Sequence, residues 1–511
     1  MLLKLLKQST DLAKLSEQQS SYRQIFKATS ILGGVQVFTI IISVLRSKAI
    51  AVLLGPAGMG IVAIYTSTIG LIAQVTNFGL GTSAVKNIAI ASESGDAEKL
   101  AKTTAVFTRL VWLTGFLGFI VALALSPFLS EIAFGHKKFT LGFVILSITL
   151  LFTQITAGQN VILQGMRKIQ YMAKATAFGS FIGLIISIPF YYFMHDDGIV
   201  PAMVLTSIAT LAVSWYYVKK VNIPKWQVEK DVFKTEGKEM LRMGFLISFS
   251  GIITLAVAYI VRIYISNSGG LKDVGLFTAG FAIINTYVGM VFSAMASDYY
   301  PRLSNVAHDN KLAKATINEQ AEIAVLILAP ILVAFLVFVN WGVIILYSKD
   351  FTGVIPMVHW ATLGIFFKAL SWSIAFIFLA KGASKAFFWN EVLANVYILI
   401  TNILGYYYFG LTGLGISFLV SYLIYFIQVL WISNKLYHFQ LSSSTIKIFG
   451  FQFAIALICF VAVYYFNTYV AYSVGVVMII ISGWFSFKEL EERLKFVEII
   501  KTKLKGRKNG A

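Results

Sequence analysis

Long apolar stretches recur along nearly the whole chain after residue 28, and short polar connections separate them. A helix that crosses a bilayer needs about 20 mainly apolar residues, because each residue advances the helix by about 1.5 Å and the hydrocarbon layer is about 30 Å thick. The pattern therefore predicts an all-α polytopic membrane protein with about fourteen transmembrane helices. The predicted spans are 29–54, 60–85, 104–126, 141–163, 175–194, 199–218, 243–266, 274–299, 321–347, 357–380, 386–409, 412–433, 448–466 and 470–487.

The composition excludes a large soluble protein. Of the 511 residues, 58% are hydrophobic and only 13% are charged, whereas a typical globular chain has roughly 25% charged residues. A soluble fold of this size needs a polar shell that so few charges cannot provide, so lipid must cover much of the apolar surface. The single cysteine, Cys459, excludes an intramolecular disulfide, and the five histidines lie too far apart in sequence for a metal site. We expect no cofactor.

Basic residues are distributed very unevenly among the connections between the spans. With the amino terminus placed in the cytoplasm, four of them fall in the connections on the opposite side, namely Lys137, Lys138, Lys272 and Lys349. Lys and Arg are retained on the cytoplasmic side during insertion, so both termini are predicted to be cytoplasmic. The net charge of +19 then follows from topology, whereas a nucleic-acid-binding protein would gather its basic residues in a folded domain.

Glycine signatures recur at one offset, which predicts an internal duplication. Gly60 and Gly275 differ by 215 positions, and so do Gly198 and Gly413. A repeat of six spans returns the chain to its starting side, so the two six-helix lobes should be related by a pseudo-twofold axis along the membrane normal. The predicted parts are an amphipathic cytoplasmic amino terminus (1–27), an N-lobe (28–218), a cytoplasmic linker (219–242), a C-lobe (243–434), two further helices (435–487) and a basic cytoplasmic tail (488–511).

Basic residues inside the predicted spans are candidates for a hydrated cavity. In the first span, Gln36 and Arg46 share a polar stripe with three- and four-residue spacing, whereas Lys48 lies about 200° around the helix from Arg46. Arg262 follows Arg46 at an offset of 216, close to that of the glycines. A charge near the membrane centre costs roughly 2.5–3.5 kcal/mol on insertion scales. These side chains should therefore face a watery cavity or extend to the lipid headgroups.

Two charges of opposite sign lie in neighbouring spans of the second half. Lys368 is near the middle of the tenth predicted span, and Glu391 shares a face of the eleventh with Asn395 and Asn402. A buried ion pair between Lys368 and Glu391 would lower the cost of both charges, and it is the favoured interpretation. The alternative is that Glu391 titrates and couples transport to H⁺ or Na⁺.

The stretch 47–91, with the turn LLGPAGMG at 53–60, resembles the first two helices of Wzx-type flippases, the polysaccharide transporter branch of the MOP superfamily. The segments SDYYPRLS (297–304) and YSKDFTGV (347–354) extend the resemblance over about the first 435 residues. The resemblance implies a MATE-like fold of two lobes. It also implies a multi-pass protein of the bacterial inner membrane that flips an undecaprenyl-pyrophosphate-linked oligosaccharide by alternating access. The repeat unit would then pass to a polymerase or ligase for O-antigen-like, lipopolysaccharide-type surface polysaccharide.

A lipid-linked pyrophosphate needs cationic groups for the phosphates, and amides or hydroxyls for the sugars. Arg46 and Arg262 are the candidates for the phosphates, and Lys48 matches a lysine in the family's opening motif. The candidates for the sugars are Gln36, Gln74 and Asn77, the last two of which share a polar stripe in the second predicted span. Polar packing between helices is an equally good explanation of these three residues.

Three other kinds of function remain open. A MATE-like multidrug or cation antiporter should place carboxylates in its lobes, whereas the first, second and seventh spans have no acidic residue. A sugar-lipid polymerase or ligase usually has large outer loops, whereas the longest outer connection here is about 14 residues, at 127–140. A structural scaffold would leave the polar stripes without a purpose. The chain also has no P-loop and no HExxH motif, so a transporter that is not an enzyme is preferred.

Overall fold

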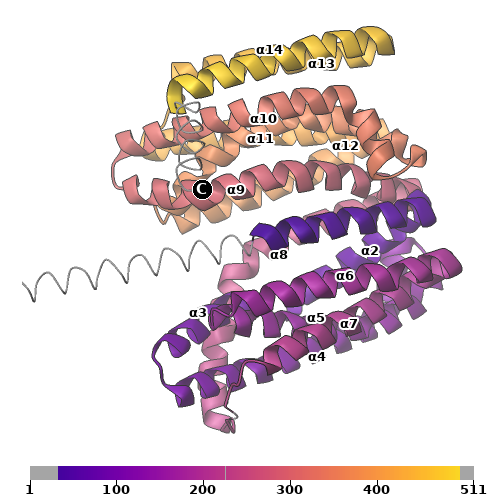
Figure 1. Cartoon of the computed structure of the whole chain (residues 1–511), viewed down its shortest axis with the longest axis vertical. Helices are drawn as coiled ribbons and strands as arrows, with labels where there is room; N and C mark the ends of the chain where they lie inside the picture. Colours follow the sequence, from indigo (N-terminus) through magenta and orange to yellow (C-terminus); the bar gives the residue numbers. More distant parts are fainter. Residues whose placement is uncertain (1–32, 225, 495–511) are drawn as a thin grey trace, which may run out of the picture. The chain divides into compact units, whose positions relative to one another are not determined.

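The computed structural model describes residues 33–224 and 226–494, and within these ranges the regular elements are helices (Figure 1). The predicted amphipathic amino terminus and the tail beyond 494 lie outside the described residues. A first helix covers Gly33–Leu53. It is followed by α2 (Gly55–Thr76), α3 (Leu80–Glu93), α4 (Ala97–Phe134), α5 (Thr140–Gly165), α6 (Ile169–Met194), α7 (Ile199–Lys219), α8 (Lys230–Ile283), α9 (Gly289–Val306), α10 (Asn310–Leu346), α11 (Ile355–Ala380), α12 (Ser384–Tyr437), α13 (Ser443–Tyr465) and α14 (Thr468–Leu494).

Eleven of the described segments are long and apolar enough to cross a membrane. Three of these segments reverse direction, at the short turn His195–Gly198 between α6 and α7, at Gly270 in α8 and at Gly410 in α12. The φ angles of Gly270 (+83°) and Gly410 (+55°) lie in the left-handed region, which glycine adopts without steric cost. Dividing each segment at its turn yields fourteen segments, the number of spans predicted from the sequence. The predicted eighth span, 274–299, differs in extent, because it runs past Ile283 through Ile284–Val288 into α9.

The described chain forms two compact units. The N-unit holds the residues up to Leu54 together with Ile64–Ile252, and the C-unit holds Gly55–Ala63 together with the residues from Ile253 onward. The predicted linker at 219–242 is partly helical, because α8 begins at Lys230, and the division between the units falls further along this helix. The first residues of α2 belong to the C-unit although the rest of the helix belongs to the N-unit.

The glycines of the predicted duplication make matching contacts in the two units. A Cβ atom on Gly198 would overlap the carbonyl oxygen of Phe190, and a Cβ atom on Gly413 would overlap the carbonyl oxygen of Gly405. Each glycine therefore allows the backbones of the two helices of its hairpin to come into direct contact. The partners Phe190 and Gly405 are themselves separated by 215 positions, so the two hairpins are closed by the same contact.

Gly60 and Gly275 face each other within the C-unit. A Cβ atom on Gly60 would overlap the carbonyl oxygen of Leu271, and a Cβ atom on Gly275 would overlap that of Pro56. Leu271 and Pro56 are again 215 positions apart, so each half of the contact is the image of the other. Such reciprocity is what a two-fold relation between two repeats produces.

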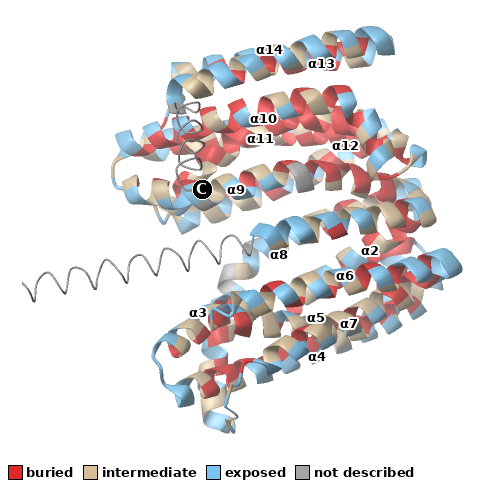
Figure 2. Cartoon of the chain, viewed as in Figure 1, coloured by how far each residue is buried: buried red, intermediate tan, exposed pale blue. Residues whose placement is uncertain are grey.

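The core of the C-unit lies on α10 and α11, where Figure 2 shows buried residues concentrated. Large apolar side chains such as Trp341, Trp431 and Trp484 are exposed. In a chain with this many spans, an exposed apolar surface of this kind is a surface for lipid.

The last two helices pack onto α10 through a buried polar cluster. Glu322 of α10 is 8% exposed, and its carboxylate accepts hydrogen bonds from Thr445 Oγ1 at 3.0 Å and Ser442 Oγ at 3.2 Å. It also forms an ion pair with Nε of Arg493 at 3.0 Å. Because these partners lie at the start of α13 and the end of α14, both helices are an integral part of the C-unit.

Candidate functional site

A cavity of about 260 Å³ lies within the C-unit, between the arms of the α8 and α12 hairpins. The turn at Gly270 folds α8 back on itself, which brings Arg262 to 5.9 Å from the ring centroid of Phe277. The polar side chains that line the cavity are Thr254, Arg262, Asn285, Asn395, Asn402 and Ser421, and aromatic rings come from Phe277, Phe281, Phe418 and Tyr422. The cavity therefore combines one cation with amides, hydroxyls and rings.

The guanidinium group of Arg262 keeps unused hydrogen-bonding capacity. Its Nη1 donates to the carbonyl oxygen of Ala258 at 3.3 Å. Its Nε is buried and has no hydrogen-bond partner in the described part of the chain. A buried donor without a partner costs about 1–3 kcal/mol, so an acceptor oxygen that entered the cavity would remove this cost. Planar guanidinium groups are well suited to phosphate oxygens for this reason.

Two asparagines present oxygen atoms in the same cavity. Asn395 Nδ2 donates to Oγ1 of Thr254 at 3.3 Å and to the carbonyl oxygen of Glu391 at 2.9 Å. Asn402 Nδ2 donates to the carbonyl oxygen of Ile398 at 2.7 Å. These bonds hold both amides in place through their NH₂ groups and leave the amide oxygens as acceptors. Sugar hydroxyl groups are donors that match such oxygens.

The salt bridges of the described residues do not include the favoured ion pair between Lys368 and Glu391. Lys368 Nζ lies 5.8 Å and 5.2 Å from the ring centroids of Phe418 and Tyr422, both of which line the cavity. Cation–π attraction stabilises a charge in this position. Glu391 Oε1 instead accepts a hydrogen bond from the hydroxyl of Tyr425 at 2.7 Å. Each charge is thus stabilised by its own uncharged neighbours.

Arg46 points into the N-unit, towards the α6–α7 hairpin. Its guanidinium group fills the space above Gly183, where a Cβ atom would lie 2.5 Å from Nη2 of Arg46 and 2.7 Å from Cγ2 of Thr206. Like Arg262, Arg46 has a buried Nε without a partner among the described residues. The two arginines belong to different compact units, and each is turned inward within its own unit.

The remaining predicted residues differ in exposure. Gln36 is exposed, whereas Lys48 and Gln74 are half-buried, with Gln74 beside Gly251. Asn77 Oδ1 accepts a hydrogen bond from the backbone N–H of Gly79 at 2.7 Å, at the break between α2 and α3. The oxygen of Asn77 therefore caps the chain locally, which favours the structural explanation for this residue.

Several cavity residues were not predicted from the sequence. Asn285, Ser421 and Tyr422 carry no motif, and they reach the cavity only because two hairpins pack together. Besides Arg262, the face shared by Asn395 and Asn402 was the signal that the sequence offered for this cavity. Among the described residues, no group of three His, Cys, Asp or Glu side chains could hold a metal ion.

Solved transporter structures share this fold. The inward closed conformation of the lipid II flippase MurJ matches with a TM-score of 0.67 and 12% identity, over 91% of this chain and 99% of that chain. An inward-facing multidrug resistance MATE family transporter of the MOP superfamily matches with a TM-score of 0.65 and 16% identity, over 78% and 95%. A MOP superfamily transporter from Pyrococcus furiosus matches with a TM-score of 0.55 and 16% identity, over 80% and 96%. The chain thus has the fold of the MOP superfamily.

The family follows from the sequence itself. Residues 49–356, more than half of the chain, match the polysaccharide biosynthesis protein family. The protein therefore belongs to this family, and the resemblance inferred from LLGPAGMG and YSKDFTGV is confirmed. A search of curated proteins finds no match. Family and fold together describe a multi-span membrane protein of the polysaccharide biosynthesis family with the MOP superfamily fold.

Proposed function

We propose that the protein is a flippase that moves an undecaprenyl-pyrophosphate-linked oligosaccharide from the cytoplasmic to the periplasmic leaflet by alternating access. The repeat unit then serves the assembly of an O-antigen-like surface polysaccharide. The observation that carries this proposal is the cavity at Arg262, where a buried guanidinium nitrogen lacks a partner. Membership of the polysaccharide biosynthesis family supports it, as does the fold shared with a flippase of lipid II.

The chemistry of the cavity fits one part of such a substrate. A pyrophosphate offers several anionic oxygens to the guanidinium fork of Arg262, and the adjoining sugar offers hydroxyl donors to the oxygens of Asn395 and Asn402. Aromatic rings at the cavity wall can pack against the apolar faces of sugar rings. With a volume of about 260 Å³ the cavity takes in only this polar junction of so large a molecule. The lipid chain then remains in the bilayer.

The cavity lining argues against a cation antiporter. A carrier for organic cations needs a carboxylate where the cation binds, whereas the lining residues of the described cavity include Arg262 and no acidic side chain. An integral-membrane polymerase or ligase is disfavoured by the described outer connections. The connection between α4, which ends at Phe134, and α5, which begins at Thr140, is too short to hold a catalytic domain.

The energy source, location and partners belong to the same proposal. With no salt bridge to Lys368, Glu391 is the group that we expect to couple transport to H⁺ or Na⁺. Its carboxylate accepts a hydrogen bond from Tyr425, and its backbone carbonyl accepts one from Asn395, which lines the cavity. We place the protein in the bacterial inner membrane with both termini in the cytoplasm, as the positive-inside rule indicates. The polymerase or ligase that uses the flipped repeat unit is the expected functional partner.

The test is replacement of Arg262 in a strain whose surface glycan depends on this gene alone. Arg262→Ala should abolish most of the surface glycan and cause the lipid-linked repeat unit to accumulate, because the phosphate oxygens lose their buried partner. Arg262→Lys keeps the charge without the planar fork and should retain part of the activity. Lys349→Ala, which removes an exposed charge of the same unit, serves as the control. Wild-type glycan in Arg262→Ala at normal protein abundance would refute the proposal.

A further inference from the structure

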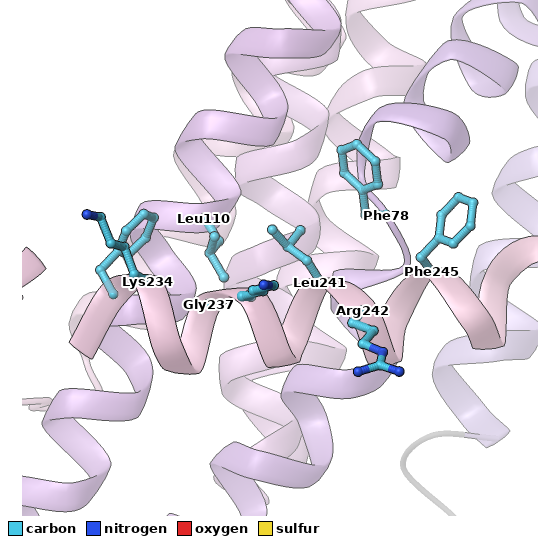
Figure 3. Close-up of a pocket in the computed structure, with 9 residues that line it drawn as sticks. Phe78, Leu110, Lys234, Gly237, Leu241, Arg242 and Phe245 are labelled. Carbon is cyan, nitrogen blue, oxygen red and sulfur yellow. The ribbon is translucent and has the colours of Figure 1, made fainter. Parts of the chain in front are cut away.

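A second concave surface lies in the N-unit, along the first turns of α8, and it plays no part in the proposed transport site. Figure 3 shows this groove, which has a volume of about 520 Å³. Apolar side chains form its floor, among them Phe233, Leu241 and Phe245. The basic residues that line it are Lys234, Lys238 and Arg242.

The helical repeat explains why these two kinds of side chain form parallel rows. Phe233, Leu241 and Phe245 recur in steps of four or eight residues, so they follow one face of α8. The basic residues are also spaced four residues apart, and each comes one position after a groove residue of the first row or Gly237. They therefore form a second row about 100° further around the helix: Lys234, Lys238 and Arg242. Gly237 also lines the groove, and a Cβ atom there would lie at ordinary contact distance, 3.5 Å, from Leu110 of α4.

The groove keeps its positive charge. Lys234, Lys238 and Arg242 are exposed, and the salt bridges of the described residues involve none of the three. Asp231, at the start of α8, is exposed and does not line the groove, and Glu236 and Glu239 have other contacts. Glu236 pairs with Lys102 of α4 at 2.8 Å, and Glu239 lines a different hollow together with Glu236. Three cations therefore border an apolar floor with no acidic side chain in the lining.

We propose that this groove binds an anionic phospholipid of the cytoplasmic leaflet. The lipid phosphate contacts Lys234, Lys238 and Arg242, and an acyl chain lies against Phe233, Leu241 and Phe245. The three basic residues lie within the predicted cytoplasmic linker (219–242), on the side of the membrane where the anionic headgroups of the inner leaflet are found. An apolar floor requires an amphiphile, since a soluble anion would leave the aromatic rings in contact with water.

Charge decides against the protein's own terminal segments as occupants of the groove. Residues 1–27 contain five basic and two acidic residues, and the residues after 494 contain six basic and one acidic residue. Both segments would bring positive charge onto three cations. A neutral lipid would fill the apolar floor but leave the three charges without a partner. An anionic phospholipid satisfies both requirements.

Binding can be measured on the purified full-length protein. Vesicles of phosphatidylglycerol and phosphatidylcholine in equal parts, and vesicles of phosphatidylcholine alone, supply the lipids, and native mass spectrometry counts the lipids retained after extraction. The test variant is Lys234→Gln/Lys238→Gln/Arg242→Gln. The matched control is Lys86→Gln/Lys168→Gln/Lys174→Gln, which removes three exposed charges of the same unit outside the groove.

The wild type should retain phosphatidylglycerol in preference to phosphatidylcholine. Each lost charge should weaken binding about fivefold, so the triple variant should bind roughly a hundredfold more weakly, while the control keeps wild-type affinity. Leu241→Asn keeps the charges and should also weaken retention, because the acyl chain loses an apolar contact. Equal retention by the triple variant and the wild type would overturn the proposal, and so would an equal loss in the control.

Two further outcomes would assign the groove to another occupant. If deletion of residues 1–27 increased phosphatidylglycerol retention several-fold, the amino-terminal segment would be the natural occupant. If the wild type formed a dimer that the triple variant lost, the occupant would be a second copy of the chain. Either result would overturn the lipid assignment. Surface glycan measurements with Arg262 variants test the transport proposal separately, so failure of one proposal does not decide the other.

Discussion

Replacing Gly60 with alanine should destabilise the protein, although alanine is the better helix former. Gly60 is buried in α2, and an added methyl group would overlap the carbonyl oxygen of Leu271 more closely than real Cβ atoms approach any atom. The neighbour is backbone and cannot rotate away. The two chain segments must therefore separate, and the packing around the contact must open.

The size of the effect follows from two opposing terms. Overpacking a tight contact costs typically about 1–3 kcal/mol, and the change from glycine to alanine within a helix returns about 1 kcal/mol. Since the overlap involves backbone, we expect a net loss of about 1–2 kcal/mol for Gly60→Ala. Gly70 provides the control within the same helix, because a Cβ atom there would meet nothing within 4 Å. Gly70→Ala should be neutral or stabilising by up to about 1 kcal/mol.

The reciprocal partner gives a second test of the same contact. Gly275→Ala should cost as much as Gly60→Ala, because its methyl group would overlap the carbonyl oxygen of Pro56. The double variant should lose less than the sum of the single losses, since the first methyl group already separates the segments. Thermal unfolding of the purified full-length protein in detergent ranks the wild type and the variants by stability. Single variants as stable as Gly70→Ala, or strictly additive losses, would refute the reasoning.

Three further predictions concern charged residues. Glu322→Ala should destabilise the docking of α14 by about 2–3 kcal/mol, less than for a fully buried pair because Arg493 also contacts Glu489. A double-mutant cycle with Arg493→Ala, followed by thermal unfolding, measures the coupling energy between the two residues. A coupling energy of zero would contradict the prediction. Glu391→Gln should change the dependence of transport on H⁺ or Na⁺ in proteoliposomes, and an unchanged dependence would make Glu391 structural. Arg46→Ala should reduce surface glycan less than Arg262→Ala, and an equal or larger loss would contradict this.

Hydropathy predicted the spans well because each membrane-spanning helix needs a long apolar stretch of sequence. It missed interruptions of the helices that depend on backbone conformation. The second predicted span, 60–85, joined two helices that the structure separates at Phe78 and Gly79, whose φ angles are +50° and +64°. An apolar window continues through such a turn without any change in composition. The helical start of α8 at Lys230 was missed for the opposite reason, since its amphipathic pattern is too polar for a span.

The sequence predicted a site residue only where the type of that residue was informative by itself. Arg262 was found because a cation inside an apolar span is costly wherever it lies. Its cavity partners on α12 lie more than a hundred residues further along the chain, and hydropathy does not indicate which distant helices pack together. Lys368 and Glu391 were predicted to form an ion pair only because their charges are opposite and their spans are neighbours in the sequence. The structure stabilises them separately because aromatic rings and a tyrosine hydroxyl, which composition counts as ordinary membrane residues, provide the contacts.

The duplication also explains why the cavity belongs to the C-unit. In the N-unit, Gly183 leaves a space that the guanidinium group of Arg46 fills. The position 215 residues later is Ile398, which lines the cavity at Arg262. Arg46 thus packs above a glycine, whereas Arg262 lines a cavity whose wall at the matching position carries an isoleucine side chain. The difference between glycine and isoleucine at this position of the repeats accompanies the difference between a packed arginine and one that borders a cavity.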